Sequence, residues 1–141
     1  MKISSFGINY YDSALDYVGY SGWQIPNVIS SVEEEYNFAN ESTAIIDRTH
    51  LGAIQVFGND SLDLLDRLST NKLIDIEIGS GISTVLTNTN GKIVDLLKIS
   101  LLSDSLLVTV SSGDINYVLE WIDKYTFDED VVFNNISECT S

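Results

Sequence analysis

The chain has 141 residues, of which 21 are acidic and 7 are basic, giving a formal net charge of −14. This length fits one compact domain, or one domain with a dependent segment, and the 44% hydrophobic fraction is typical of a folded globular protein. Nucleic acids and anionic membrane surfaces bind basic proteins, so this charge argues against both as partners. No stretch is long and apolar enough to span a bilayer, and the N-terminus lacks the apolar run of a signal peptide. The one cysteine, Cys139, cannot form an internal disulfide, and we expect a reduced cytoplasmic protein.

The first fifty residues are rich in aromatic side chains and contain the only proline, Pro26. Residues 20–26 are expected to be extended with a turn, because Pro26 restricts the residue before it to extended geometry. Helix-forming residues from Val28 to about Glu41 predict one helix, whose acidic triplet 33–35 is expected to be a solvated face. The single histidine, His50, leaves no zinc cluster and no Cys–His pair, so we expect a structural imidazole with satisfied hydrogen bonds and no metal site.

The sequence from Ala44 onward alternates between short strands and helices. Strands are predicted over Ala44–Asp47 and Ala53–Phe57, and Asp60 is expected to cap a helix running from Ser61 to about Ser69. Within that helix leucines recur at helical spacing, so one apolar face is expected to be buried.

A hairpin is predicted next, between Ile82–Thr87 and Lys92–Leu101, with Asn90 and Gly91 supplying positive φ at the turn. A further strand is predicted over Ser105–Val110. Ser111 or Ser112 is then expected to cap a helix over Asp114–Lys124, whose apolar residues fall on one stripe. A closing strand over Val131–Phe133 completes the order β-α-β-β-β-α-β. This order predicts an α+β fold: an antiparallel sheet of split β-α-β, ferredoxin-like type, with two helices on one face.

Asp95 is the chemical anomaly of the chain. It alternates with Ile93, Leu97, Ile99 and Leu101, so it is expected to face the same way as these aliphatic side chains. A carboxylate in such a place must find hydrogen-bond donors, change its protonation or face a cavity. The alternatives are a bulge near Asn90–Gly91 that turns Asp95 outward, or capping of nearby backbone amides.

Several segments, taken together and in order, resemble the aminomethyltransferase (glycine-cleavage T-protein) and YgfZ family of folate-binding proteins. The matching pieces are Gly22–Pro26, Glu35, Ile46–Gly52, Val56–Asp60, Leu65–Asn71, Leu86–Asp95 and Trp121–Ile122. The resemblance implies a tetrahydrofolate-binding domain of a T-protein-like enzyme, which moves a one-carbon unit from an aminomethyl donor to tetrahydrofolate. Two alternatives stay open: a YgfZ-type, folate-dependent factor that maintains iron–sulfur proteins, and a non-catalytic interaction module that keeps only the fold.

The resemblance also implies the site residues. Asp95 matches the first aspartate of a paired motif and is the catalytic candidate, whereas the second aspartate falls on Leu96, which cannot transfer a proton. Ser83 stands at the position of an aromatic residue and Ser111 at that of an asparagine. Leu51 and Val110 are expected to form apolar walls of the pocket. The implied folate-binding set is Leu51, Ser83, Asp95, Leu96, Val110 and Ser111.

Members of this family are much longer than this chain and bind folate inside a ring of domains. The resemblance implies that residues 51–137 form one folate-binding domain, that residues 1–50 belong to an incomplete neighbouring domain, and that 138–141 are a tail. We therefore expect a second polypeptide or self-association to complete the ring. Folates and the acidic lipoyl carrier protein would both meet a repulsive charge of −14, and Arg48, Lys92 and Lys98 are the candidate cations that offset it locally. Folate is the preferred partner, and docking of the carrier protein is expected less.

Overall fold

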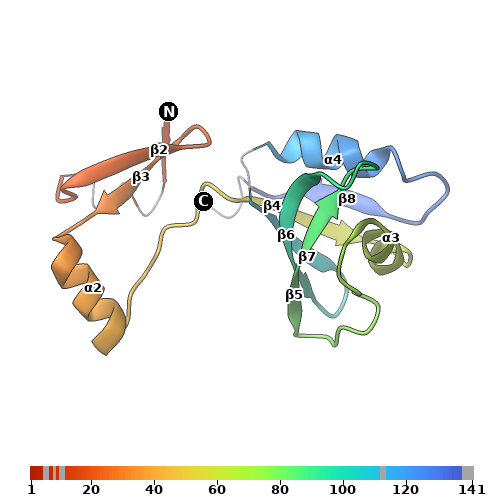
Figure 1. Cartoon of the computed structure of the whole chain (residues 1–141), viewed down its shortest axis with the longest axis horizontal. Helices are drawn as coiled ribbons and strands as arrows, with labels where there is room; N and C mark the ends of the chain where they lie inside the picture. The colour runs from red at the N-terminus through yellow and green to blue at the C-terminus, as the bar shows by residue number, and fades with distance from the viewer. Residues whose placement is uncertain (5–6, 8, 10–11, 112–113, 138–141) are drawn as a thin grey trace. The chain divides into compact units, whose positions relative to one another are not determined.

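The computed structural model describes residues 1–4, 7, 9, 12–111 and 114–137 (Figure 1). Ser112 and the predicted tail 138–141 lie outside the described residues. Contacts within the chain divide it after His50 into two units, Met1–His50 and the residues from Leu51 onward. Among the described residues, no helix combines the length and apolar character needed to cross a membrane.

The Met1–His50 unit contains a small sheet of order β1-β3-β2. Strand β3 (Trp23–Val28) pairs in parallel with β1 (Lys2–Ile3) and antiparallel with β2 (Asp16–Tyr20). Ser21 and Gly22 connect β2 to β3 with φ values of 48° and 83°, the left-handed geometry of a tight turn. The predicted extended segment is therefore one arm and the turn of a hairpin.

Helix α2 (Val32–Glu41) follows this sheet and begins four residues later than predicted. Its start is set by Ser31, whose side chain accepts a hydrogen bond from the Glu34 amide at 3.2 Å. Glu35 reaches back to the preceding turn and accepts hydrogen bonds from the amides of Ile29 and Ser30 at 2.6 and 3.0 Å. Glu35 of the helix therefore stabilises the turn that precedes the helix.

The prediction of a strand over Ala44–Asp47 is wrong. Residues 43–48 have no regular secondary structure, and Ile45 and Ile46 are exposed. An apolar run becomes a strand only where a neighbouring strand accepts and donates its backbone hydrogen bonds. Within the described residues of this unit, the paired strands are β1, β2 and β3, and none of them pairs with this run.

The second unit is built on a five-stranded antiparallel sheet of order β5-β6-β7-β4-β8. Strands β4, β6, β7 and β8 have the spatial order of a split β-α-β fold, and β5 extends the sheet at one edge. The bounds of its elements are β4 Gly52–Phe57, α3 Ser61–Leu68, β5 Gly81–Thr87, β6 Ile93–Leu101, β7 Leu106–Val110, α4 Ile115–Asp123 and β8 Val132–Asn135.

One continuous core lies between this sheet and its two helices. From the sheet it includes alternate residues of β4, β6 and β7, and from the helices it includes Leu64, Leu65, Val118 and Ile122. Because these strand residues all share one face, both helices cover the same side of the sheet, which we call the inner face. The predicted α+β fold, an antiparallel sheet with two helices on one face, is confirmed.

Both predicted helix caps in this unit are wrong. Asp60 precedes α3 but makes no side-chain cap, because its Oδ2 accepts a hydrogen bond from the Asp130 amide at 2.8 Å instead. Helix α4 is capped by Asp114, which accepts from the Tyr117 amide at 3.1 Å, and not by Ser111. The hydroxyl of Ser111 has another partner, Asp95.

The β5–β6 hairpin contains an irregularity that decides which side chains face the core. Only Gly91 has a positive φ, 72°, so the turn differs from the predicted one, in which Asn90 shares this geometry. The register shifts beside Leu86, so that Asp95 pairs with Leu86 and Ile93 pairs with Thr87. This bulge turns Ile93 outward, 72% exposed, and leaves Asp95 facing the core.

Candidate functional site

Asp95 is only 3% exposed and lies on the inner face of β6, next to fully buried leucines. Its Oδ1 accepts hydrogen bonds from the Leu96 amide at 2.7 Å, from the Ser111 amide at 3.3 Å and, at short range, from the Ser111 hydroxyl. Its Oδ2 is buried and has no hydrogen-bond partner among the described residues. Of the alternatives left open by the sequence, Asp95 has therefore found donors, but for one oxygen only.

Three of the predicted folate-binding residues come together at the end of the sheet. Gly52 pairs with Val110 and Val110 pairs with Leu97, so Leu51 and Ser111, each one residue outside its strand, and Leu96 of β6 follow at neighbouring backbone positions. Leu96 is 50% exposed, Ser111 is exposed and Leu51 is half-buried. We call these three residues the Leu51–Leu96–Ser111 row.

Ser83 lies on the same, outer face of the sheet, which no helix of the described residues of this unit covers. It pairs with Lys98, which in turn pairs with Thr109, so an exposed ammonium group stands between two hydroxyl-bearing residues. Lys98 is two residues from Leu96 on β6, and side chains two apart in a strand share a face. Of the two predicted cations in this unit, Lys98 is the one located beside the row, since Lys92 is in the hairpin turn.

The remaining two predicted site residues face the other way. Val110 is 1% exposed and packs in the core, close to Gly52 and Ile115. Asp95 is equally enclosed, so a ligand on the outer face meets neither side chain directly. The one exposed side chain hydrogen-bonded to Asp95 within the described residues is Ser111, and sequence reasoning missed this link. The only sequence signal for this hydrogen bond is that a carboxylate among aliphatic residues needs hydrogen-bond donors nearby.

A cavity of about 350 Å³ lies within the Met1–His50 unit, and its lining includes four isoleucines and polar groups from Asp47, Arg48 and His50. Burial raises the pKa of Asp47, but hydrogen bonds from Ser4 and Thr49 and the nearby His50 outweigh it and bring the pKa below its usual value. Burial lowers the pKa of His50, Arg48 lowers it further, and Asp47 opposes the shift.

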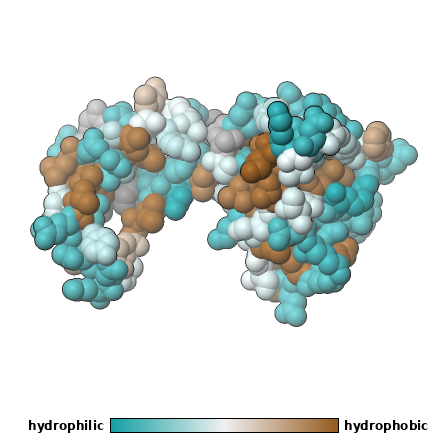
Figure 2. Space-filling model, in the orientation of Figure 1, coloured by the Kyte–Doolittle hydropathy of each residue, from teal (hydrophilic) through white to brown (hydrophobic). Residues whose placement is uncertain are grey.

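The imidazole of His50 rests on Tyr20, with ring centroids 4.7 Å apart and the rings edge to face. Its Nδ1 is buried without a hydrogen-bond partner among the described residues, so the prediction of a satisfied imidazole is wrong for this nitrogen. The same unit exposes many large apolar side chains, visible as brown patches in Figure 2. They include Leu15, Val32, Tyr36, Phe38, Ile45 and Ile46. None of the α2 residues is buried.

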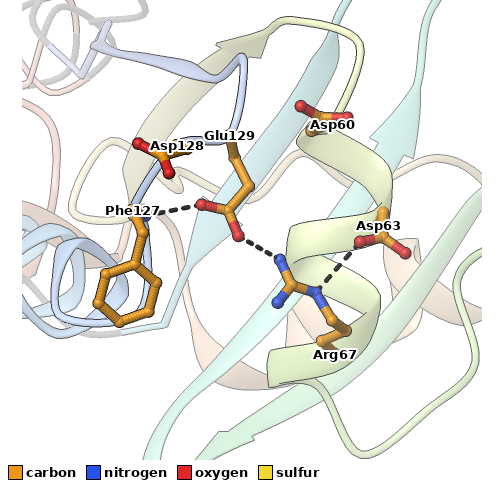
Figure 3. A pocket seen from close by; sticks show the side chains of 6 residues that line it. All are labelled: Asp60, Asp63, Arg67, Phe127, Asp128 and Glu129. Atoms are coloured by element: carbon orange, nitrogen blue, oxygen red, sulfur yellow. Dashed lines mark hydrogen bonds and ion pairs between the residues drawn. The ribbon is translucent and has the colours of Figure 1, made fainter.

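Another cavity, of about 430 Å³, lies beside the loop between α4 and β8 and is lined by charged residues (Figure 3). Arg67 contacts Asp63 at 3.1 Å and Glu129 at 2.6 Å, and the Phe127 amide donates to Glu129 at 2.7 Å. The Phe127 amide and Arg67 together lower the pKa of Glu129 to about 2. These contacts fasten the loop to α3, and no predicted folate-binding residue lines this cavity.

No group of histidine, cysteine and acidic side chains suited to a metal ion occurs among the described residues. The outer face is chemically different from a metal site: a leucine pair, one serine hydroxyl linked to a buried carboxylate, and a lysine two residues away. These apolar, hydroxyl and ammonium groups are surface groups, and none of them lines the cavities described above.

Comparison with known proteins identifies the class to which this chain belongs, the aminomethyltransferase T-proteins. In the solved structures, the glycine cleavage system aminomethyltransferase T from Bartonella henselae matches with a TM-score of 0.80 at 17% sequence identity, over 96% of this chain and 38% of that one. Residues 13–141 match the family described as the GCVT N-terminal domain. The chain belongs to this family, and the resemblance seen in its motifs is confirmed.

Two curated relatives agree with this assignment. The aminomethyltransferase of Thermotoga maritima is 31% identical over 125 residues, which cover 88% of this chain and 34% of the relative. The aminomethyltransferase of Bacillus velezensis is 29% identical over 133 residues, which cover 91% of this chain and 36% of the relative. The chain thus spans about a third of the length of the curated relatives it matches.

Proposed function

We propose that this chain is the tetrahydrofolate-binding domain of a T-protein-like aminomethyltransferase, and that the ligand lies on the outer face against the Leu51–Leu96–Ser111 row. The family supports the aminomethyltransferase part of this proposal. The observation that carries the folate part is the convergence of this row beside the buried carboxylate of Asp95. Within this proposal folate is the substrate and no metal takes part.

The geometry suits a folate in two respects. The exposed Leu96 and half-buried Leu51 offer an apolar surface for a flat heterocycle, and Ser111 offers a hydrogen-bonding group at its edge. Lys98, next along β6 on the same face, offers a positive charge for the carboxylates of the folate tail.

Aminomethyl transfer itself needs more than this row. Leu96 stands where the resemblance places the second aspartate of the pair, and a leucine side chain neither gives nor takes a proton. Asp95, the catalytic candidate of the sequence, is enclosed on the inner face, so we propose that it contributes without touching the ligand. Since the chain spans about a third of its relatives, we propose that the complete reaction requires the remaining two thirds. A cytoplasmic setting fits this assignment.

Calorimetric titration with tetrahydrofolate tests the proposal. We expect saturable binding in the micromolar range, weakened severalfold by Leu96→Ala through the loss of apolar contact. The matched control is Leu102→Ala, an exposed leucine just after β6 and outside the row, which is expected to bind as the unchanged chain does. Absence of heat at high micromolar tetrahydrofolate would favour a non-catalytic interaction module.

The exposed apolar surface of Met1–His50 favours a protein partner in either case. A 50-residue unit whose described apolar side chains include a single buried one, Ile25, has little core of its own. We propose that a polypeptide equivalent to the rest of the relatives covers this surface. Self-association is the alternative, opposed by the like charge of two copies. Sedimentation of the chain alone and with such a polypeptide distinguishes the two. Phe38→Ser, at an exposed apolar residue of this surface, is expected to abolish whichever association is observed.

A further inference from the structure

The carboxylate of Asp95 is asymmetric in its contacts. Oδ1 accepts three hydrogen bonds, two of them from Ser111, whereas Oδ2 has none within the described residues. The side chain is 3% exposed and faces the core, while Ser111 is exposed at the end of β7. Ser111 is the exposed member of this pair, so a ligand at this end of the sheet can contact Ser111 but not the enclosed carboxylate.

A serine hydroxyl has one proton to donate and two lone pairs that accept. In Ser111 the proton is committed to Asp95 Oδ1, so the hydroxyl oxygen keeps its lone pairs and acts toward a ligand as an acceptor. A hydroxyl that donates to a charged acceptor is itself polarised and accepts more strongly from a second donor, an effect that grows in a site of low dielectric. The pair therefore selects a ligand group that carries N–H.

We propose that Asp95 acts on the ligand through Ser111: Ser111 Oγ accepts a hydrogen bond from an N–H group of the tetrahydrofolate ring, and Asp95 is the positioning residue that orients and polarises this hydroxyl. The proposal rests on the proposed function and refines it, because it assigns the direct contact to Ser111 rather than to Asp95. It also explains how a carboxylate on the inner face of the sheet serves a site on the outer face.

The position of the row supports this division of roles. Leu51 and Leu96 take the backbone positions on either side of Ser111, so a flat ring that contacts one of these leucines lies next to Ser111. The Ser111 amide also donates to Asp95, at 3.3 Å, so the backbone holds the carboxylate in place when the hydroxyl is removed. Replacement of Ser111 is thus expected to change binding more than stability.

A double-mutant cycle on the dissociation constant for tetrahydrofolate tests the pair, using Ser111→Ala, Asp95→Asn and the double variant of the full chain. If the two residues act as one unit, each single change weakens binding about tenfold and the double change also weakens it about tenfold. Ser111→Thr, which keeps a hydroxyl, is expected to restore most of the affinity. Ser80→Ala, an exposed serine in the turn before β5, is the matched control and should bind normally.

The possible failures are distinguishable. A hundredfold loss in the double variant means independent contacts and overturns the pair while leaving folate binding intact, and so does normal binding by Ser111→Ala. Absence of binding by the unchanged chain overturns the proposed function and the pair together. Thermal unfolding of each variant, followed in parallel, separates loss of affinity from loss of fold. Because Ser111 is exposed, the comparison of Ser111→Ala with Ser111→Thr decides the matter even if Asp95→Asn unfolds.

Discussion

Gly58→Ala is expected to destabilise the second unit severely. Gly58 joins β4 to α3 with a φ of 112°, and a Cβ built there would lie 1.9 Å from the carbonyl oxygen of Asp130. The backbone conformation alone costs an L-residue on the order of 1–3 kcal/mol. Relieving the overlap moves the loop at Asp130 and costs on the order of 1–3 kcal/mol more, as in other overpacked sites.

The expected total is about 4 kcal/mol, near half the stability of a typical small domain. Urea unfolding followed by the fluorescence of Trp121 measures it, in a Trp23→Phe background that removes the signal of the other unit. The matched control is Gly79→Ala, where φ is 86° but nothing lies within 4 Å of the added Cβ. We expect the control to lose only about 1 kcal/mol for its backbone conformation. Equal losses at the two glycines would refute the steric argument.

Further predictions concern the core, the charged loop and the outer face. Leu64→Ala removes a side chain with no exposed surface and should cost about 2–5 kcal/mol in urea unfolding. The pKa of Glu129 is lowered in the folded state to about 2. Its ionised form therefore contributes to folding stability above the unfolded pKa near 4.5, and this contribution is lost as the pH falls toward 2. Glu129→Gln should flatten the acid limb of a stability–pH curve over that range. Lys98→Ala should weaken tetrahydrofolate binding severalfold at low salt, and Lys124→Ala should not; equal effects would mean that only net charge matters.

The order of helices and strands along the second unit was predictable because each element carries its own periodic pattern. Leucines at helical spacing and alternating aliphatic residues are local signals, and the core that they predict is the one observed. The failed strand over Ala44–Asp47 has an equally apolar sequence but lacks a neighbour, which no local pattern reveals. The caps failed for a similar reason, since Asp60 and Ser111 each bind a partner distant in sequence.

The candidate site was predictable in part. The anomaly at Asp95 is visible in the sequence, and its burial follows from strand alternation. The bulge that turns Ile93 outward, by contrast, depends on the geometry of the hairpin and not on the alternation. The separation of Leu96 from Asp95 onto opposite faces follows from their adjacency, yet the contact between Asp95 and Ser111 depends on the pairing of β6 with β7.

The central claim is that tetrahydrofolate binds the outer face at the Leu51–Leu96–Ser111 row. Its most direct test is a titration of the ¹⁵N-labelled chain with tetrahydrofolate, followed through the amide resonances. We predict saturable shifts that are largest at Leu51, Leu96 and Ser111 and their strand neighbours. Shifts confined to the cavity of Met1–His50, or none at millimolar ligand, would contradict the account.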